Sequence, residues 1–364
     1  MFGHRTRMRA LLAWLVVAAA IAGCSTPEPE PRDPLAGILS DLRFDGGRAL
    51  ARTLDVIHDP DGQPRYRVPH TPGNDEAARI LHDTLASYGW SVRYENFTGA
   101  QYRELDLRPV AGWVNACDNA QYDAVTTFRF HNVVAEKDAL PPGAVNGWAH
   151  KTHLVVLGAH YDSKRFATAD PDPQHRDEPI LGADDGAGGA GILLELARVL
   201  AEVDLGFQVR IVLFDGEDGF EDCHPLAGSM WHAQRNPRDW KSERFVLLDM
   251  VSNASAQFYR EGSSAASAPR LLDEIWSIAA RMGVDAFVNE TGTTVTDDHT
   301  SFIAQGVPSI DIINSRPGRT FPPYWHTTDD DADVLDAGMM GDVGRVLEAT
   351  LRLWAAEPAR LSRA

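Results

Sequence analysis

Three short apolar runs, each followed directly by acidic residues, constrain the fold of this chain more than any other sequence feature. The runs cover residues 154–157, 209–214 and 245–248, and apolar residues with helical spacing fill 187–203 between the first two. Continuous apolar runs of this length are typical of strands that are buried on both faces. We therefore predict an α/β fold, a single domain with a central, mostly parallel mixed β-sheet and helices on both faces.

Other segments carry similar signals. We expect a helix over 75–88 with Asn74 as its N-cap and Gly89 at its stop, because Asn caps helices well and Gly is common just past their ends. The remaining predicted elements are strands at 92–97 and 310–313, a strand or hairpin within 125–136, and helices at 270–282 and 338–356.

The residues that follow the three apolar runs bring chemistry to one edge of the predicted sheet. His160 and Asp162 follow the first run, Glu217 and Asp218 the second, and Asp249 the third. The carboxyl ends of parallel strands meet at the edge where open α/β sheets bind ligands. Carboxylates gathered there would repel one another unless a divalent cation lay among them, so the sequence predicts a metal site at this edge.

Two further segments add candidate ligands. The glycine-rich stretch 182–189 contains Asp184 and Asp185 at the start of the predicted helix, where one of the two could simply cap the helix. A late segment, 324–330, supplies His326, and the acidic residues that follow it are expected to form a solvated loop and helix start. Histidine and carboxylate ligands that leave one position open are typical of catalytic zinc sites.

The first residues of the chain have the pattern of an export signal. Arg5, Arg7 and Arg9 precede an apolar stretch at 11–22 that is too short for an ordinary membrane-spanning helix. The stretch ends in Ile-Ala-Gly-Cys at 21–24, which resembles a bacterial lipoprotein signal with Cys24 as the lipidated residue. A plain secretory signal with an incidental Cys is the alternative.

We expect the signal peptide to cover residues 1–23, a lipidated Pro- and Glu-rich tether to cover 24–34, and the folded domain to cover 35–364. In the lipoproteins that the chain resembles, a residue such as Ser25 after the Cys goes with outer-membrane sorting. The expected location is the bacterial cell envelope, on the outer membrane and facing the periplasm, with the lipid as the sole membrane contact.

Composition and cysteine content limit which macromolecules the chain can bind and which residues can hold its metal. With 52 acidic and 34 basic residues the formal charge is −18, so a nucleic-acid partner is not expected. Cys117 and Cys223 could form a disulfide in an oxidising compartment, but two separated cysteines do not make a zinc knuckle. His and carboxylate side chains must therefore supply the metal ligands.

Five motifs, in order, resemble the zinc aminopeptidase and glutaminyl cyclase superfamily: GAHYDSK, GADDGAGG, FDGED, LLDM and YWHTTDD. The resemblance implies a zinc-exopeptidase-like fold that acts on peptide N-termini. It matches zinc ligands with Asp185, Asp218 and His326, and the catalytic general acid/base with Glu217. Position 218 departs from the pattern, because the family usually has Glu there and Asp is one methylene shorter.

The resemblance leaves the role of two residues open. His160 and Asp249 match ligands of a second zinc in dinuclear aminopeptidases, where Asp185 bridges the metals, yet they persist in cyclases that bind one zinc. They are therefore candidates either for a second metal or for substrate binding. Asp162 would orient His160, as carboxylates commonly do for metal-binding imidazoles.

The two branches of the superfamily differ in the nucleophile. An aminopeptidase uses a metal-activated water, whereas a cyclase uses the substrate's own α-amine to attack the γ-carboxamide of an N-terminal Gln. Asp297, which matches an Asp of the cyclase proton network, and Trp325, which matches an aromatic that holds the glutaminyl group, favour the cyclase with one zinc. The alternative role of Asp297 is only to begin the helix containing Phe302. The alternative function is an aminopeptidase with two zinc ions.

Overall fold

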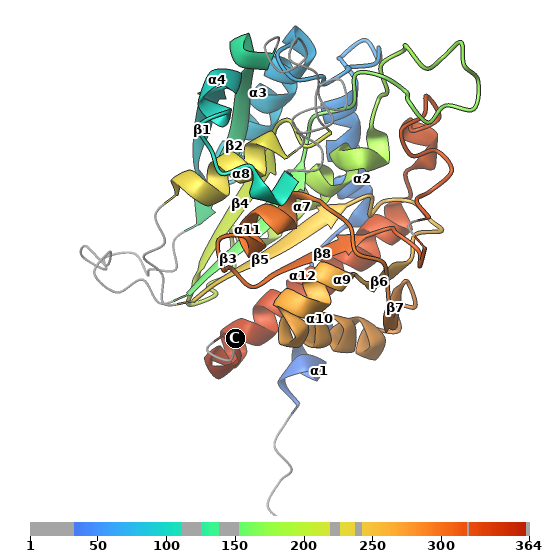
Figure 1. The fold of residues 1–364 in the computed structure, drawn as a ribbon. Coiled ribbons are helices and arrows are strands. Elements are labelled where there is room, and N and C mark those ends of the chain that lie inside the picture. Colours follow the sequence, from blue (N-terminus) through green and yellow to red (C-terminus); the bar gives the residue numbers. More distant parts are fainter. Residues whose placement is uncertain are drawn as a thin grey trace, which may run out of the picture. The chain divides into compact units, whose positions relative to one another are not determined.

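The computed structural model describes residues 33–110, 125–137, 153–218, 226–236, 242–318 and 320–361. The compact unit Pro34–Ala364 is built on a six-stranded sheet with the strand order β1-β2-β4-β3-β5-β8 (Figure 1). Its strands are β1 (Ser91–Thr98), β2 (Arg129–Lys137), β3 (His153–His160), β4 (Gln208–Phe214), β5 (Ser242–Asp249) and β8 (Ser309–Ile313). Strands β4, β3, β5 and β8 are parallel, and β2 and β1 join antiparallel at one side. The predicted mixed, mostly parallel sheet is confirmed.

Helices cover both faces of this sheet. One face carries α2 (Gly46–Ile57), α3 (Pro72–Ser87), α7 (Gly189–Leu200), α10 (Pro269–Met282) and α12 (Ala337–Ala356), and the other carries α8 (Ala227–Arg235) and α11 (Asp298–Ile303). Shorter helices are α1 (Pro34–Leu39), α4 (Gly99–Tyr102) and α9 (Gly262–Ser267). A separate parallel pair consists of β6 (Phe258–Arg260) and β7 (Phe287–Thr291).

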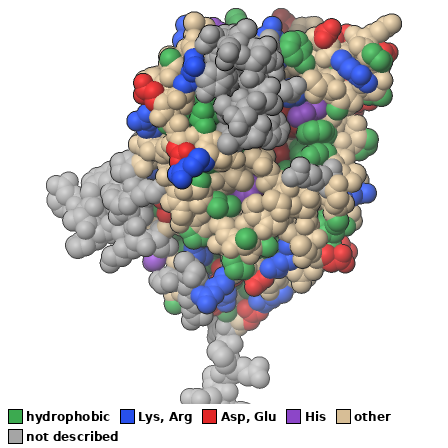
Figure 2. All heavy atoms as spheres, viewed as in Figure 1, with side chains coloured by type: hydrophobic (Ala, Val, Ile, Leu, Met, Phe, Trp, Pro, Cys, Tyr) green, Lys and Arg blue, Asp and Glu red, His purple; other side chains and the backbone are tan. Residues whose placement is uncertain are grey.

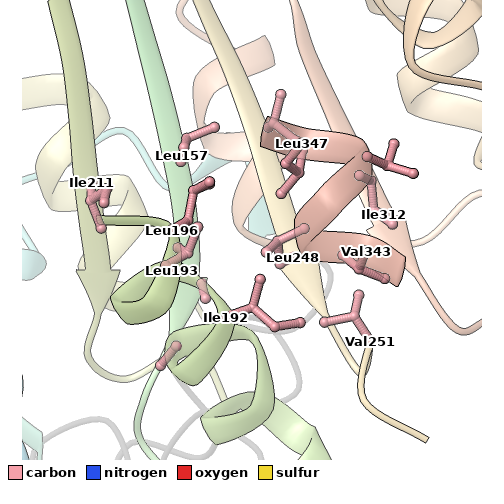
Figure 3. Packing of buried hydrophobic residues seen from close by; sticks show 14 of the residues in the cluster. Leu157, Ile192, Leu193, Leu196, Ile211, Leu248, Val251, Ile312, Val343 and Leu347 are labelled. Atoms are coloured by element: carbon pink, nitrogen blue, oxygen red, sulfur yellow. The ribbon is translucent and has the colours of Figure 1, made fainter. Parts of the chain in front are cut away.

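The larger core lies between the sheet and α7 and α12. Figure 3 shows Leu193 and Leu196 of α7 beside Leu157 and Ile211 of the strands, with Leu347 of α12 over β5 and β8. These side chains are fully buried, and each stabilises the fold by roughly 1.5–3 kcal/mol relative to exposure. The apolar runs are continuous because residues on both faces of these strands are covered.

The opposite face packs around aromatic rings. The rings of Phe245 and Phe302 stack with centroids 3.9 Å apart, and Phe214 meets both edge-on. Gly158 of β3 lies beneath them, where an added Cβ would lie 2.5 Å from the Phe245 ring. The glycine before the Ala159-His160 end of β3 thus lets the aromatic layer approach the strand closely.

Several predicted boundaries need correction. The N-cap of α3 is Thr71, whose hydroxyl accepts the Asn74 amide, whereas Asn74 is a buried helical residue. Of the strand or hairpin expected within 125–136, the strand is confirmed as β2, which a short 3-10 turn precedes. Asp184 does not cap α7, because its carboxylate accepts the Ser252 amide and the Tyr324 hydroxyl instead.

Three further observations concern the surface charge, the length of the helices and the predicted features outside the described residues. On the face shown in Figure 2, acidic and basic side chains are interspersed rather than gathered by sign. Within the described ranges, none of the helices combines the length and apolar character needed to cross a bilayer. The predicted signal peptide, the lipidation site Cys24, and Cys117 and Cys223 lie outside the described residues.

Candidate active site

A cavity of about 290 Å³ opens where β3, β4 and β5 end. Its volume is near the lower end of the range for small-ligand pockets, so it suits one side chain rather than a long segment. Its lining combines carboxylates and an imidazole with apolar groups. The lining residues are Lys164, Asp185, Glu217, Asp218, Asp249, Met250, Val295, Thr296, Asp297, Ile313, Phe321, Trp325 and His326.

The register of the parallel strands brings the predicted residues together. His160 is the last residue of β3 and pairs with Phe214, the last of β4, so Glu217 and Asp218 follow within one turn of the chain. Asp249 ends β5 on the other side of β3. The expectation that these strand ends share one edge is confirmed.

Asp185 lies between two imidazole rings. Its Oδ1 is 3.1 Å from His160 Nε2 and its Oδ2 is 3.6 Å from His326 Nε2. His326 Nε2 is also 3.0 Å from Asp218 Oδ1, and His160 Nε2 is 3.3 Å from Asp249 Oδ1. The three predicted zinc ligands therefore meet at one point, and the shorter Asp218 side chain reaches it. His160 in turn connects Asp185 to Asp249.

Burial leaves these carboxylates without enough compensating partners among the described residues. Asp185 Oδ2, Asp218 Oδ2 and Asp249 Oδ1 are buried and accept no hydrogen bond. Burial, reinforced by the charge of Asp297, raises the pKa of Asp249 well above its usual value. Unpaired buried oxygens of this kind are costly, so the site is suited to a bound cation.

The donor set fits zinc. His160, Asp185, Glu217 and Asp218 each present a ligand atom, all within 4.8 Å of one another. Imidazole nitrogen and carboxylate oxygen are ordinary zinc ligands, and the cavity supplies the open position of a catalytic site. Glu217 belongs to this group as well, which places the predicted acid/base directly beside any metal held there.

Asp162 connects the imidazole to the acid/base segment. Its Oδ1 lies 3.3 Å from His160 Nδ1, as expected for a carboxylate that orients a ligating ring. The same carboxylate also accepts the backbone amides of Glu217, at 3.1 Å, and Asp218, at 3.3 Å. The fully buried Asp162 side chain thus holds both the His160 ring and the main chain of Glu217 and Asp218.

Glu217 is half-buried and lines the cavity with other acids nearby. Desolvation raises its pKa well above the usual value, and the charge of Asp297 adds to that increase while His160 opposes it. A carboxyl group in this setting can carry a proton near neutral pH, which general acid/base catalysis requires.

Asp297 and Trp325 both reach the cavity. Asp297 caps α11 by accepting the Asp298 amide, so the alternative role as a helix start is real, but the same side chain lines the pocket. The Trp325 ring stacks on His326 with centroids 3.7 Å apart and on Phe321 at 4.5 Å. These rings give the cavity a flat apolar wall next to the ligand group.

Sequence reasoning missed some residues of the site. Asp330, expected in a solvated loop, is fully buried and accepts the amides of Asp184 and Asp185. Lys164 and Phe321 line the cavity, and only the position of Lys164 inside the GAHYDSK motif could have pointed to it. Behind Asp297, a second buried group consists of His299 and Asp311.

The sequence matches a known family over most of this region. The profile of Peptidase family M28 matches residues 143–351, which include every predicted site residue except Cys24. The chain belongs to peptidase family M28.

Relatives of this M28 protein include members of both enzyme types. It is 27% identical over 357 residues to the glutaminyl-peptide cyclotransferase-like protein of Bos taurus, spanning 88% of this chain and 81% of that relative. The glutaminyl cyclase of Porphyromonas gingivalis is 28% identical with a TM-score of 0.70, covering 85% and 98% of the two chains. A leucine aminopeptidase precursor of Bacteroides thetaiotaomicron is 26% identical with a TM-score of 0.69, over 85% and 98%.

Proposed function

We propose that this M28 protein is a zinc-dependent glutaminyl-peptide cyclotransferase, which converts an N-terminal Gln of a peptide to pyroglutamate and releases ammonia. The observation that carries the proposal is that one small cavity unites Glu217, Asp297 and the Trp325 ring with the ligand group. The likeness to cyclases over most of both chains supports the same reading.

The residues of this chain divide the work as follows. Asp185, Asp218 and His326 would hold one zinc ion, which when bound polarises the γ-carbonyl of the substrate Gln. The flat Trp325 wall holds the glutaminyl side chain against this group. The new bond joins the α-nitrogen to Cδ, and the bond from Cδ to the amide nitrogen breaks. Glu217 accepts the proton of the attacking amine and delivers it to the departing nitrogen, which leaves as ammonia.

A direct test compares two peptides that differ only in the first residue. Zinc-loaded enzyme is incubated with a Gln-initiated and a Leu-initiated peptide, and the products are read by mass spectrometry. We expect the Gln peptide to lose one ammonia and the Leu peptide to stay intact. Release of free Leu would overturn the cyclase in favour of an aminopeptidase.

An aminopeptidase is the second candidate because His160 Nε2 lies close to both Asp185 and Asp249, and these three residues could hold a second metal. Metal analysis of the purified protein separates the two functions further. One zinc per chain agrees with the cyclase, whereas two zinc ions together with Leu release would establish the hydrolase.

We also propose that the mature protein is anchored through lipidated Cys24 in the cell envelope, on the outer membrane facing the periplasm. The basis is the charged, apolar and small-residue order of residues 1–24. The test is Cys24→Ala in a bacterial host: the wild-type chain should partition with membranes, and the variant should be released. Equal membrane association of both would contradict the anchor.

A further inference from the structure

Arg67, in the segment between α2 and α3, is the largest charged side chain that is completely buried in the described part of the chain. All three kinds of nitrogen in its guanidinium donate to backbone carbonyls: Nε to Tyr161 at 2.6 Å, Nη1 to Leu181 at 2.6 Å and Nη2 to Gly182 at 2.7 Å. A buried guanidinium is costly unless it is hydrogen-bonded, and here the planar fork is satisfied by three short bonds.

These carbonyls belong to the two loops that deliver metal-site residues. Tyr161 stands between His160 and Asp162, and Gly182 begins the turn that carries Asp185. Gly182 has a φ of 62°, and a Cβ there would lie 2.4 Å from the Asp185 carbonyl oxygen and 3.2 Å from Arg67 Nη2. The two loops therefore pack closely around the guanidinium.

The main chain of Arg67 strengthens the same connection. Its amide donates to Ser163 Oγ at 3.0 Å, and the Ser163 amide donates back to the Arg67 carbonyl at 3.3 Å. Through Asp162, this link continues to the amides of Glu217 and Asp218. A displacement of Arg67 would therefore be expected to move both the predicted metal ligands and the main chain at Glu217.

Arg67 also places positive charge behind an acidic site. Burial lowers its pKa to about 10, while Asp162, Asp330 and Asp218 favour the charged form, so the guanidinium remains positive at neutral pH. Among the described residues it forms no ion pair, and its three side-chain hydrogen bonds all go to backbone carbonyls. Its charge acts on the nearby carboxylates without occupying their oxygens.

We propose that Arg67 is a positioning residue that sets the metal affinity of the site by clamping the Tyr161 and Leu181-Gly182 carbonyls, so that His160, Asp162 and Asp185 converge. This inference rests on the metal site of the proposed function and concerns the affinity for zinc rather than the reaction.

The test measures the zinc dissociation constant by competition with a chromophoric chelator, without substrate. Arg67→Met removes both the charge and the three hydrogen bonds to the carbonyls. Arg67→Lys keeps the charge but loses the planar guanidinium that makes these three bonds. The matched control is Arg65→Met. Arg65 is also buried and donates to two backbone carbonyls, Asp55 and Val56, both at 2.7 Å, but these belong to the last turn of α2, which carries no predicted site residue.

Residues that orient metal ligands typically change metal affinity by about 10–100-fold, and we expect weakening of that size in both Arg67 variants. Arg65→Met should lower the melting temperature and leave zinc affinity unchanged. Ser163→Ala, which removes only the bond to the Arg67 amide, should fold even if the Arg67 variants do not, and should weaken zinc binding to a smaller extent.

Wild-type zinc affinity in a folded Arg67 variant would overturn the positioning role, as would equal losses in the Arg65 and Arg67 variants. If the Arg67 variants do not fold, wild-type affinity in Ser163→Ala would overturn it. Absence of zinc binding by the wild-type protein would instead overturn the proposed function, so the two failures are distinct.

Discussion

At the scale of single residues, the proposed chemistry depends most on Glu217. Its carboxyl group is the candidate acid/base and lines the cavity. It also presents an oxygen within 4.8 Å of the ligand atoms of Asp185 and Asp218. Its role can be separated from metal binding, because the three predicted ligands meet without it.

Glu217→Gln should abolish proton transfer and leave the zinc ligands in place. We expect the turnover rate for a Gln-initiated peptide to fall by about 10²–10⁴-fold, the usual contribution of a general acid/base. Ammonia release measures the rate, and metal analysis checks that zinc is retained. Glu178→Gln, in the exposed loop near the His326 segment, serves as the control. Unchanged turnover would remove Glu217 from the mechanism.

Gly186 packs so closely against the His160 ring that there is no room for a side chain at this position. A Cβ at this position would lie 2.1 Å from His160 Nε2. Gly186→Ala should displace the His160 ring and lower the free energy of unfolding by roughly 1–3 kcal/mol, as overpacking usually does. Denaturant unfolding and zinc titration measure both effects. Gly37→Ala, where a Cβ meets nothing within 4 Å, should have neither.

Residue identities at the site could be predicted because each ligand type follows a recognisable strand or lies in a motif. The motifs predict Asp185, Asp218 and His326 as ligands, and the structure places His326 Nε2 3.6 Å from an Asp185 oxygen and 3.0 Å from an Asp218 oxygen. The position of Arg67 could not be predicted, since its acceptors are backbone carbonyls 94 to 115 residues away and carry no residue-type signal.

At the scale of elements, strand positions could be predicted more closely than helix starts. The buried runs have few ways to pack, whereas a helix can begin at any nearby residue whose side chain accepts an amide. Asn74 lies inside α3, where its Nδ2 donates to the Arg67 carbonyl and to Asp215 Oδ1, and Thr71 takes the cap position by accepting the Asn74 amide. Such competition between local and distant partners is not visible in the sequence.

Glu261 is a second cap that depends on tertiary contacts, and it predicts a pH effect. Burial alone would raise the pKa of Glu261, but the hydrogen bond and charge of His299 and the donors of Ser264 and Ser263 lower it to about 2. The carboxylate caps α9 and also accepts the Val295 amide. Its ionised form therefore stabilises the fold above its unfolded pKa, near 4.5, and this contribution is lost as the pH falls toward 2.

Glu261→Gln should lower the free energy of unfolding at pH 7 by roughly 1–3 kcal/mol, because buried donors lose a charged acceptor. The difference from wild type should shrink as the pH falls from 4.5 toward 2, since protonation removes the same charge from the wild-type protein. Denaturant unfolding at several pH values measures it. Exposed Glu290→Gln is the control, and a difference independent of pH would contradict the assignment.

At the scale of the whole molecule, the acidic residues that matter most for stability are the buried ones around the site. The net charge is −18, yet acidic and basic groups are mixed on the surface shown in Figure 2, while many carboxylates around the site are buried. Global stability should therefore depend on a cation in the cavity.

Removal of metal should lower the melting temperature, and added zinc should restore it. A ligand that binds only the folded state stabilises it by about 2.7 kcal/mol at a free concentration of 100 times its dissociation constant. Calorimetry with and without a chelator measures this, and an Asp185→Asn/His326→Ala double variant should show no response to either. Equal melting of the loaded and stripped wild-type protein would contradict a buried cation site.

The spread of the ligands along the chain also fixes an order of events during biosynthesis. His326 is the last of the predicted zinc ligands to leave the ribosome, because it lies in a loop after β8. A nascent chain thus lacks the complete predicted ligand set of Asp185, Asp218 and His326 until almost all of it has been made. Metal loading must follow synthesis, in whichever compartment the finished polypeptide folds.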